Sequence, residues 1–511
     1  MEMPRTPGVY VDEISLIPPS VAEVATAVPA FIGYTEKAPD GHNDFNNPKP
    51  LRIMSMFEYE YYFGKAAPAV INVEIGRGDT DVNTMVVDSI DVEPSPYLMY
   101  HNLQMYFKNG GGPCYIVSVG TYTRTKSALT GPFERGITSL EDEDEPTLIV
   151  LTDATNLGTD QSAQNTNYYG LVQQALTQCG TLKDRFTIID TLQQEESPSS
   201  TLDSSRSAID AGVLRDSGPS AYLMYGAAYY PYLKTTLPHY YVENTVYEND
   251  NVTELWDGVT VSFDYVLSPP FDSPPLSPPA FDSPPGAGDL WDMELGDPRL
   301  KEGHTDLYNA IKAELSNRRI TMPPGGAMAG IYARVDRNRG VWKAPANEGV
   351  LGVIGPDIKI NNETQKTLNV HSSGKSIDAI RSFVGKGTLV WGARTLAGND
   401  NEWRYVSVRR LFNMIEESVQ ESTEWAVFEG NDAMTWLKVK TQIEVYLEGL
   451  WRRGALAGPS PAAAFFVNVG LGVTMDANDI LEGRMNVEIG IAAVRPAEFI
   501  ILKFSHKMQE A

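Results

Sequence analysis

The chain has 511 residues, 42% of them hydrophobic, which is enough to build more than one core and excludes wholesale disorder. The net charge of −25 argues against nucleic acid as a partner. Residues 330–511 hold equal numbers of acidic and basic residues, so the whole acidic excess lies in residues 1–329, where it favours a soluble outer surface. The two cysteines cannot form a disulfide framework, and we expect assembly in a reducing cytoplasm.

The first residues of the chain predict an extended arm rather than a helix. Five prolines in residues 1–35 exclude a long helix, and residues 6–14 alternate like a short strand. No turn joins this strand to a partner in the sequence, and an isolated strand is unstable. Residues 15–29 are predicted to be a leash. We expect neither a secretory signal nor a membrane span, since no apolar run reaches about 18 residues.

The middle of the chain alternates between strand and helix patterns. A helix at 97–108 ends at three glycines, and the strand 114–119 follows. Further strands are predicted at 147–151, 186–189 and 221–225, with helices at 168–178 and 207–214 between them. This βαβαβ order is typical of an α/β fold with a partly parallel sheet.

Residues 266–287 form a proline-rich segment of low complexity. The motif PPFDSPP at 269–275 nearly recurs as PPAFDSPP at 278–285. Such a segment favours polyproline II and cannot build a sheet interior, so it predicts a surface loop. A ligand for a proline-recognising module is the alternative interpretation.

The pattern of the last third of the chain predicts a second α/β region. Asn431 is expected to cap a helix that ends before Gly454, because apolar residues recur at helical spacing between them. Another helix is predicted at 408–419, with strands at 464–469, 485–491 and 498–504.

Motifs for catalysis are incomplete. The sequence SGKS at 373–376 resembles the end of a phosphate-binding loop, but Asn369 stands where that loop needs glycine. Gly470 and Gly472 lack the third glycine of a dinucleotide loop, and the six histidines have no metal-ligand spacing. We therefore predict no catalytic residue, cofactor or metal, and no enzyme. A phosphohydrolase built on the middle α/β region is the alternative.

Nine stretches near both ends and through most of residues 325–511 share the pattern of one known family. They are TPGVYVDEI at 6–14, VPAFIG at 28–33, NGGGPCYIVSV at 109–119, AGIYARVD at 329–336, GVWKAPAN at 340–347, VWGARTL at 390–396, RRLF at 409–412, WAVFE at 425–429 and VRPAEFI at 494–500. In these stretches the chain resembles the contractile tail sheath proteins of phages, phage-derived bacteriocins and extracellular contractile injection systems. The proline-rich stretch and residues 70–95 depart from the family pattern.

The resemblance implies an α/β protein with an α+β inner domain made by the two ends of the chain, and an inserted α/β outer domain. The expected boundaries are an arm at 1–28, the inner domain at 29–120 and 326–495, the outer domain at 121–325, and a second arm at 496–511. The implied function is a structural subunit that polymerises helically around an inner tube and contracts to drive the tube through a target envelope. Another self-assembling shell or baseplate component is a further alternative.

The resemblance also implies partners and a place of assembly. We expect stacked hexameric rings of this chain, in contact with an inner tube protein, baseplate proteins, cap proteins and sibling sheath proteins, with neither nucleic acid binding nor direct membrane insertion. Assembly is expected in the bacterial or infected host cytoplasm, within a phage-tail-like particle that is released by lysis.

Two sets of residues are candidates for assembly contacts. Strands at both ends of the chain are expected to be donated to neighbouring subunits, and the helix at 431–454 is expected to face the tube. The strand residues are Val9, Tyr10, Val11, Ile14, Phe499, Ile500, Ile501 and Leu502; the tube-facing residues are Lys438, Lys440, Arg452 and Arg453. The alternative for the basic residues is a solvated helix face.

Overall fold

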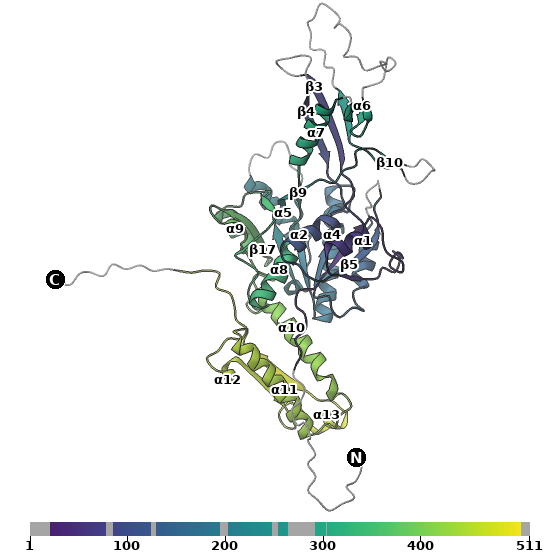
Figure 1. Cartoon of the computed structure of the whole chain (residues 1–511). Helices are drawn as coiled ribbons and strands as arrows, with labels where there is room; N and C mark the ends of the chain where they lie inside the picture. Colours follow the sequence, from purple (N-terminus) through teal and green to yellow (C-terminus); the bar gives the residue numbers. More distant parts are fainter. Residues whose placement is uncertain are drawn as a thin grey trace, which may run out of the picture. The chain divides into compact units, whose positions relative to one another are not determined.

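A computed structural model describes residues 21–77, 85–123, 129–194, 203–247, 254–263, 292–302 and 304–501 (Figure 1). The predicted strand at 6–14, the proline-rich segment 266–287 and Leu502 lie outside these residues. The chain forms two compact units. The central unit contains residues 27–335 and 345–404, and the carboxyl-terminal unit contains 336–344, 405–511 and the residues before 27.

A nine-stranded sheet forms the middle of the central unit. Its order is β15-β18-β17-β8-β7-β6-β1-β5-β2, and it is parallel from β17 to β5 with antiparallel strands at both edges. The parallel strands are continuous apolar runs because both faces are covered. The strands are β1 (Pro29–Thr35), β2 (Leu51–Ile53), β5 (Cys114–Thr121), β6 (Leu148–Leu151), β7 (Phe186–Asp190), β8 (Gly226–Tyr230), β15 (Glu348–Gly349), β17 (Ile377–Phe383) and β18 (Gly387–Val390).

Helices pack on both faces of this sheet. On one face, the ring of Phe31 in β1 contacts Tyr106 in α2, with ring centroids 5.2 Å apart. On the other face, Ile32 of β1 packs so closely against Gly136 in α3 that a Cβ there would lie 2.8 Å from it. The helices are α1 (Met56–Phe63), α2 (Met99–Lys108), α3 (Gly131–Thr138), α4 (Gln161–Leu182), α5 (Asp203–Ser217), α8 (Gly325–Arg339) and α9 (Asn362–Asn369), with the 3-10 turns η1 (Ala154–Asn156) and η2 (Leu223–Tyr225).

Smaller sheets complete the central unit. A four-stranded sheet in the order β13-β12-β3-β4 packs on α7 (Thr305–Asn317) around its own apolar core, and its strands β3 and β4 come from the region 70–95. A three-stranded sheet has the order β14-β9-β16, and β10 pairs with β11. The remaining elements are β3 (Val70–Arg77), β4 (Met85–Glu93), β9 (Leu233–Pro238), β10 (Val246–Tyr247), β11 (Glu254–Trp256), β12 (Thr260–Phe263), β13 (Asp292–Glu294), β14 (Arg319–Met322), β16 (Val353–Pro356) and α6 (Pro298–Lys301).

The carboxyl-terminal unit is built from two long helices and a strand pair. Apolar residues of α10 (Val406–Thr423) and α11 (Ala433–Arg452) share one core with β19 (Phe465–Val469) and β20 (Val487–Ile491). Gly454 has φ of 85° and ends α11, as predicted, because glycine adopts this left-handed conformation without a steric penalty. The short elements are η3 (Glu424–Ala426), α12 (Pro461–Ala464) and α13 (Ala477–Leu481).

Most predicted elements are confirmed, but the cap of α11 and the strand at 221–225 differ from the prediction. Asp432, not Asn431, caps α11, since its carboxylate accepts from the backbone N–H groups of Met434 and Thr435. Asn431 instead accepts from the indole of Trp436. The predicted strand 221–225 is the 3-10 turn η2, and β8 begins directly after it at Gly226.

The compact units also divide the chain differently from the expected domains. β1 hydrogen-bonds to β5 on one side and to β6 on the other, so residues 29–120 and 121–325 share one sheet. Residues 345–404 add β15, β17 and β18 to the same sheet. The expected boundary at 120/121 therefore falls inside the central unit, because both edges of β1 are paired.

Candidate functional site

The sheet of the carboxyl-terminal unit has only two strands among the described residues. β19 and β20 are antiparallel, with Phe465 opposite Ile491 and Val469 opposite Val487. Along these residues neither outer edge pairs with another strand among the residues that the structure describes. A strand pair alone is marginally stable, and here α11 packs against β19 to support it. The two edges present free backbone N–H and C=O groups that a further strand could use.

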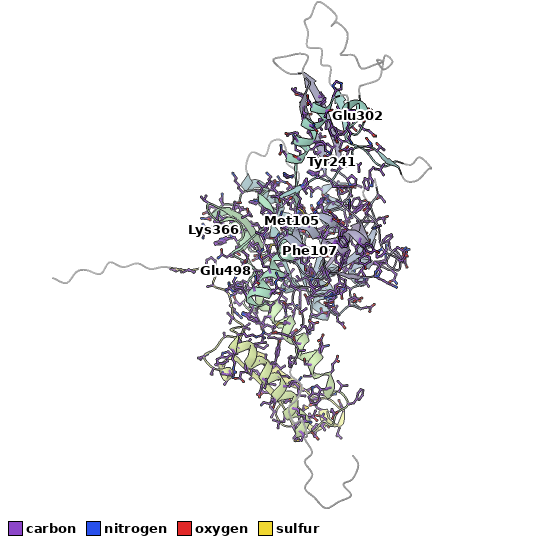
Figure 2. All side chains as sticks on the ribbon, viewed as in Figure 1. Met105, Phe107, Tyr241, Glu302, Lys366 and Glu498 are labelled. Carbon is purple, nitrogen blue, oxygen red and sulfur yellow. The ribbon has the colours of Figure 1, made fainter. Side chains whose placement is uncertain are left out.

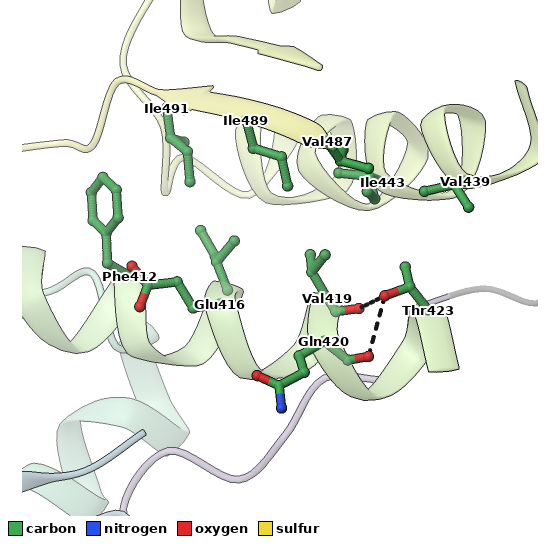
Figure 3. Close-up of a pocket in the computed structure, with 11 residues that line it drawn as sticks. Phe412, Glu416, Val419, Gln420, Thr423, Val439, Ile443, Val487, Ile489 and Ile491 are labelled. Carbon is green, nitrogen blue, oxygen red and sulfur yellow. Dashed lines mark hydrogen bonds between the residues drawn. The ribbon is translucent and has the colours of Figure 1, made fainter. Parts of the chain in front are cut away.

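A groove of about 350 Å³ lies between α10 and this strand pair (Figure 3). The side chains of Val487, Ile489 and Ile491 point from β20 toward α10, as Figure 3 shows, and all three are only partly buried. The hydroxyl of Thr423 donates to the carbonyls of its own helix at 2.8 and 3.2 Å. The groove is therefore mainly apolar. Its lining residues are Phe412, Ile415, Glu416, Val419, Gln420, Thr423, Val439, Ile443, Val487, Ile489 and Ile491.

Residues 21–26 are bound to α10 of their own chain. The backbone N–H groups of Ala22 and Val24 donate to the hydroxyls of Ser422 and Ser418, each at 3.1 Å. The segment runs antiparallel to the helix, since its residue numbers rise as those of its partners fall. The prediction of a leash over residues 15–29 is therefore wrong for 21–26, because serine side chains on one face of α10 satisfy its backbone.

A buried ion pair fixes the end of this segment. The guanidinium of Arg410 lies 2.5 Å from the carboxylate of Asp336, and only 3% and 6% of the two side chains are exposed. Arg410 also donates to the carbonyl of Thr26, and the hydroxyl of Thr26 donates to Asp336. Arg410 is therefore an ion-pair partner within its own chain. Arg409 likewise pairs with Glu416, at 3.0 Å.

The four predicted tube-facing residues differ in their surroundings. Lys438 is exposed and forms no ion pair among the described residues, whereas Lys440 lies 3.8 Å from Glu444 on the same helix. Arg452 pairs with Glu448 at 2.6 Å, one turn away. Arg453 binds both oxygens of Glu23, at 2.5 and 2.9 Å, and so holds the segment 21–26. The lysines thus lie on the outer face of α11, beside the exposed apolar side chains of Met434, Leu437 and Val445.

The predicted strand at 498–504 is not formed in the part of it that the structure describes. Residues 494–501 have no regular secondary structure, and Glu498 lies on this stretch (Figure 2). The side chains of Phe499, Ile500 and Ile501 are 73%, 79% and 80% exposed. Three consecutive large apolar residues are thus left in water, which is costly unless another surface covers them.

The fragment that resembled a phosphate loop has a structural role. The ammonium group of Lys375 is buried and donates to the carbonyls of Leu214, Arg215 and Gly218, at the end of α5. Burial lowers the pKa of this lysine. Because a lysine at a helix C-terminus satisfies carbonyls that have no partner within the helix, Lys375 caps α5 and does not reach toward a phosphate.

Two buried aspartates occupy the ends of parallel strands, where open α/β sheets commonly bind ligands. Asp153 follows β6 and accepts from the backbone N–H groups of Tyr34 at 2.7 Å and Met99 at 3.0 Å, the latter at the start of α2. Asp190 ends β7 and accepts from Gly325, the first residue of α8, at 2.8 Å. Burial raises the pKa of each to about 7. Both carboxylates serve as helix caps.

Sequence reasoning missed these caps. The available signal was an acidic residue directly after a buried strand, but the helices that they cap lie far away in the chain. No group of three acidic, histidine or cysteine side chains in the described residues is arranged to hold a metal ion. Likewise, none of the described helices is long and apolar enough to cross a membrane.

Comparison with protein families gives one matching domain. Residues 398–507 match the family model of the phage tail sheath C-terminal domain, which includes α10, α11, β19 and β20. The tail sheath protein of Enterobacteria phage T4 is 30% identical over 147 residues, which are 28% of this chain and 21% of that protein. A putative prophage major tail sheath protein of Pseudomonas aeruginosa is 24% identical over 34% of this chain and 44% of that protein. The match thus spans about a fifth to under half of these relatives.

Solved structures extend the likeness to nearly the whole chain. The helical sheath of the anti-feeding prophage in its contracted state has a TM-score of 0.61 and 27% identity, covering 99% of this chain and 100% of that one. The sheath complex of the extracellular contractile injection system PVC, also contracted, has a TM-score of 0.59 and 28% identity, with 99% of both chains covered. The likeness therefore includes the central unit as well as the carboxyl-terminal unit.

Proposed function

Because this chain belongs to the family of contractile tail sheath proteins, we propose that it is a structural subunit of a sheath that polymerises helically around an inner tube and contracts. The observation that carries the proposal is the likeness to injection-system sheaths over 99% of the chain. The family consists of structural proteins, so the chain is not an enzyme. The alternative of a phosphohydrolase is not favoured, and the capping role of Lys375 removes its main motif.

The proposed assembly contact is strand addition to the pair β19–β20. The arms of neighbouring subunits supply the strands: Val9, Tyr10, Val11 and Ile14 from one end, and Phe499, Ile500, Ile501 and Leu502 from the other. Support comes from the unpaired edges of the pair and from the exposure of Phe499, Ile500 and Ile501. Each backbone hydrogen bond is worth about 0.5–1.5 kcal/mol, and burying each large apolar side chain about 1.5–3 kcal/mol.

The groove beside β20 gives a reason for the contact to be specific. Val487, Ile489 and Ile491 are partly buried on the face toward α10, so an added strand or the segment leading to it would cover apolar surface as well as backbone. A head-to-tail contact of this kind does not close on itself and generates a helical lattice. Arms would keep neighbouring subunits connected while their bodies move during contraction.

The tube contact is proposed for the outer face of α11. Lys438 and Lys440 would supply charge there, and Met434, Leu437 and Val445 would supply apolar surface. Exposed charge pairs are worth only about 0–1 kcal/mol each, which suits a contact that contraction must release. Arg452 and Arg453 contribute less in this proposal, because both already pair with carboxylates of their own chain.

The individual partners and the place of assembly are proposed by analogy with the family. We propose stacked hexameric rings of this chain around the tube, bounded by baseplate and cap proteins, in a phage-tail-like or extracellular injection particle. Assembly would take place in the bacterial or infected host cytoplasm, with release by lysis.

Negative-stain microscopy of the chain co-expressed with its tube protein tests the proposal. Striated tubes that shorten and widen on a contraction trigger are expected. Closed shells, or a monomer that never polymerises on tubes, would contradict it.

A further inference from the structure

An apolar patch lies at one edge of the nine-stranded sheet. Met54, Phe57 and Tyr61 are 51%, 79% and 68% exposed, and we call them the α1 patch. They follow the edge strand β2, and Phe57 and Tyr61 stand one helical turn apart on the same side of α1. The other face of α1 holds the buried Tyr59 and Phe63. Since the core side of α1 is already satisfied, the exposed aromatics are not needed to hold the helix in place.

A second apolar patch lies toward the opposite edge of the same sheet. Leu351, Ile354 and Val384 are 51%, 66% and 105% exposed, and we call them the β16 patch. Leu351 and Ile354 belong to β16 and the turn before it, and β16 packs against β17 and β18. Val384 lies in the turn between β17 and β18, where it follows the pair Phe383 and Gly387. The side chain of Val384 therefore buries no surface within its own chain.

The sheet order separates the two patches. β2 is the last strand at one edge, whereas β17, β18 and β15 form the other edge, and five strands lie between β2 and β17. In Figure 1, α1 and β17 lie on different sides of the central unit. Two different patches on opposite sides of one rigid sheet cannot meet within a molecule. They can meet only between copies, in a head-to-tail contact that forms rings or helices.

The charged groups around the patches are complementary. Glu58 and Glu60 lie on α1, and Glu36 contacts its end through the N–H of Lys65; none of the three glutamates has an ion pair among the described residues. Lys65 is a cation among them. Around the β16 patch, the exposed Lys359 and Lys386 have no ion pair among the described residues. The excess of carboxylates at one patch and of ammonium groups at the other favours contact between them and disfavours contact between two like patches.

We propose that the α1 patch of one subunit docks on the β16 patch of the next copy of this chain. The inference rests on the proposed sheath function and names the contact between subunit bodies, separate from the strand arms. Phe57 and Tyr61 are the anchors, because aromatic side chains bury the most apolar area for the least conformational cost.

Cysteine cross-linking between two differently tagged variants tests this contact. Phe57→Cys and Val384→Cys are assembled together into sheaths and treated with short bis-maleimides. Cys114 and Cys179 are both buried and free, and burial raises the pKa of Cys179 to about 12, so neither native thiol competes. A cross-linked product carrying both tags is expected from the mixture only. Assembled sheaths without this product, or a dimer from either variant alone, would overturn the inference.

Charge at the turn between β17 and β18 gives a second test. Val384→Asp places a carboxylate against the acidic α1 patch, whereas Val384→Lys places an ammonium group there. We expect the critical concentration for assembly to rise at least tenfold with aspartate and by less with lysine. The control is Ile209→Asp on α5, at a side chain that is 50% exposed and outside both patches. Equal effects of the two Val384 variants would contradict the charge argument.

Different results would reject the patch contact and the sheath function. Sheaths that form normally with all patch variants would reject the patch contact and leave the sheath function standing. Absence of any sheath from the unaltered chain with its tube would reject both.

Discussion

The nine-stranded sheet of the central unit and the two-stranded sheet of the carboxyl-terminal unit bury their residues to different extents. Every residue of β1 and β7 is buried, while none of β20 is fully buried. The first sheet has helices on both faces and gains nothing from a partner at its middle strands. The second has apolar side chains beside an open groove, and neither of its edges pairs with another strand in the part of the chain that the structure describes. The core around the first sheet is therefore complete within the chain, whereas the second sheet leaves apolar side chains and backbone groups exposed.

The largest effect is expected from removing an arm. Deleting residues 1–16 should leave a folded, soluble subunit, because residues 21–26 still bind α10, but it should abolish sheath formation. The free edges of β19–β20 would then lack a donated strand. Thermal unfolding of the truncated chain and microscopy with tubes provide the measurements. Contractile tubes of normal appearance from this truncation would contradict the proposed strand addition.

A single charge in the groove should have the next largest effect. Ile489→Asp puts a carboxylate on the partly buried face of β20, where a donated strand would have to desolvate it. We expect assembly to fall by more than tenfold while the isolated subunit remains folded. The matched control is Glu488→Gln, on the exposed face of the same strand. If both variants assemble equally well, the groove is not covered in the sheath.

Most strands and helices of the two units could be predicted from the sequence, because secondary structure depends on local patterns. Unbroken apolar runs identified β5, β6 and β7, and helical spacing identified α10 and α11. The order of the strands could not be predicted, since the pairing of β1 with both β5 and β6 depends on contacts between residues about 85 and 119 positions apart. The caps Asp153 and Asp190 could not be predicted for the same reason, because each binds a helix that is distant in the sequence. Residues 21–26 were misjudged because their partners are serines on a distant helix.

The strand 221–225 was misplaced for a local reason. Its apolar and aromatic residues matched a strand, but Tyr222 has φ of 54° and its ring packs against Gly180 of α4. β8 itself contains Gly226, Ala227 and Ala228, which have low strand propensity. The position of β8 is therefore decided by its packing against neighbouring strands and not by its own amino-acid composition.

The buried ion pair Arg410–Asp336 should affect the stability of the folded subunit rather than its assembly. Arg410→Ala leaves Asp336 buried without its cation and should lower the free energy of unfolding by about 3–5 kcal/mol. Arg452→Ala is the control, because its ion pair with Glu448 is exposed and should matter by about 0–1 kcal/mol. Denaturant unfolding of the full chain measures both. Equal losses would show that the segment 21–26 does not depend on this pair.

A smaller, salt-dependent effect is expected on the outer face of α11. Reversing Lys438 and Lys440 to glutamate should weaken binding to tubes by at most about 2 kcal/mol at low salt, with the difference fading as ions screen it. Lys366→Glu, on the exposed helix α9, is the control for a change in net charge. Co-sedimentation with tubes over a range of salt concentrations gives the comparison. Unchanged binding at every salt concentration would leave these lysines as a solvated face.

The smallest effect is expected from deleting the proline-rich segment 266–287. β12 ends at Phe263 and β13 begins at Asp292, and these strands pair antiparallel with Ser262 opposite Asp292. The ends of the connection are therefore neighbours in space, and the residues left after the deletion suffice to join them. A shorter loop also costs less entropy to close.

Sheaths of normal appearance and an unchanged or slightly raised melting temperature are expected from this deletion. The control is a glycine and serine segment of equal length in place of 266–287, which keeps the length and removes the proline composition. If the deletion alone prevented tube formation while the replacement restored it, the length of the connection would matter. If neither assembled, the proline-rich sequence itself would be an interface, and the central unit would contribute to the assembly contacts as well.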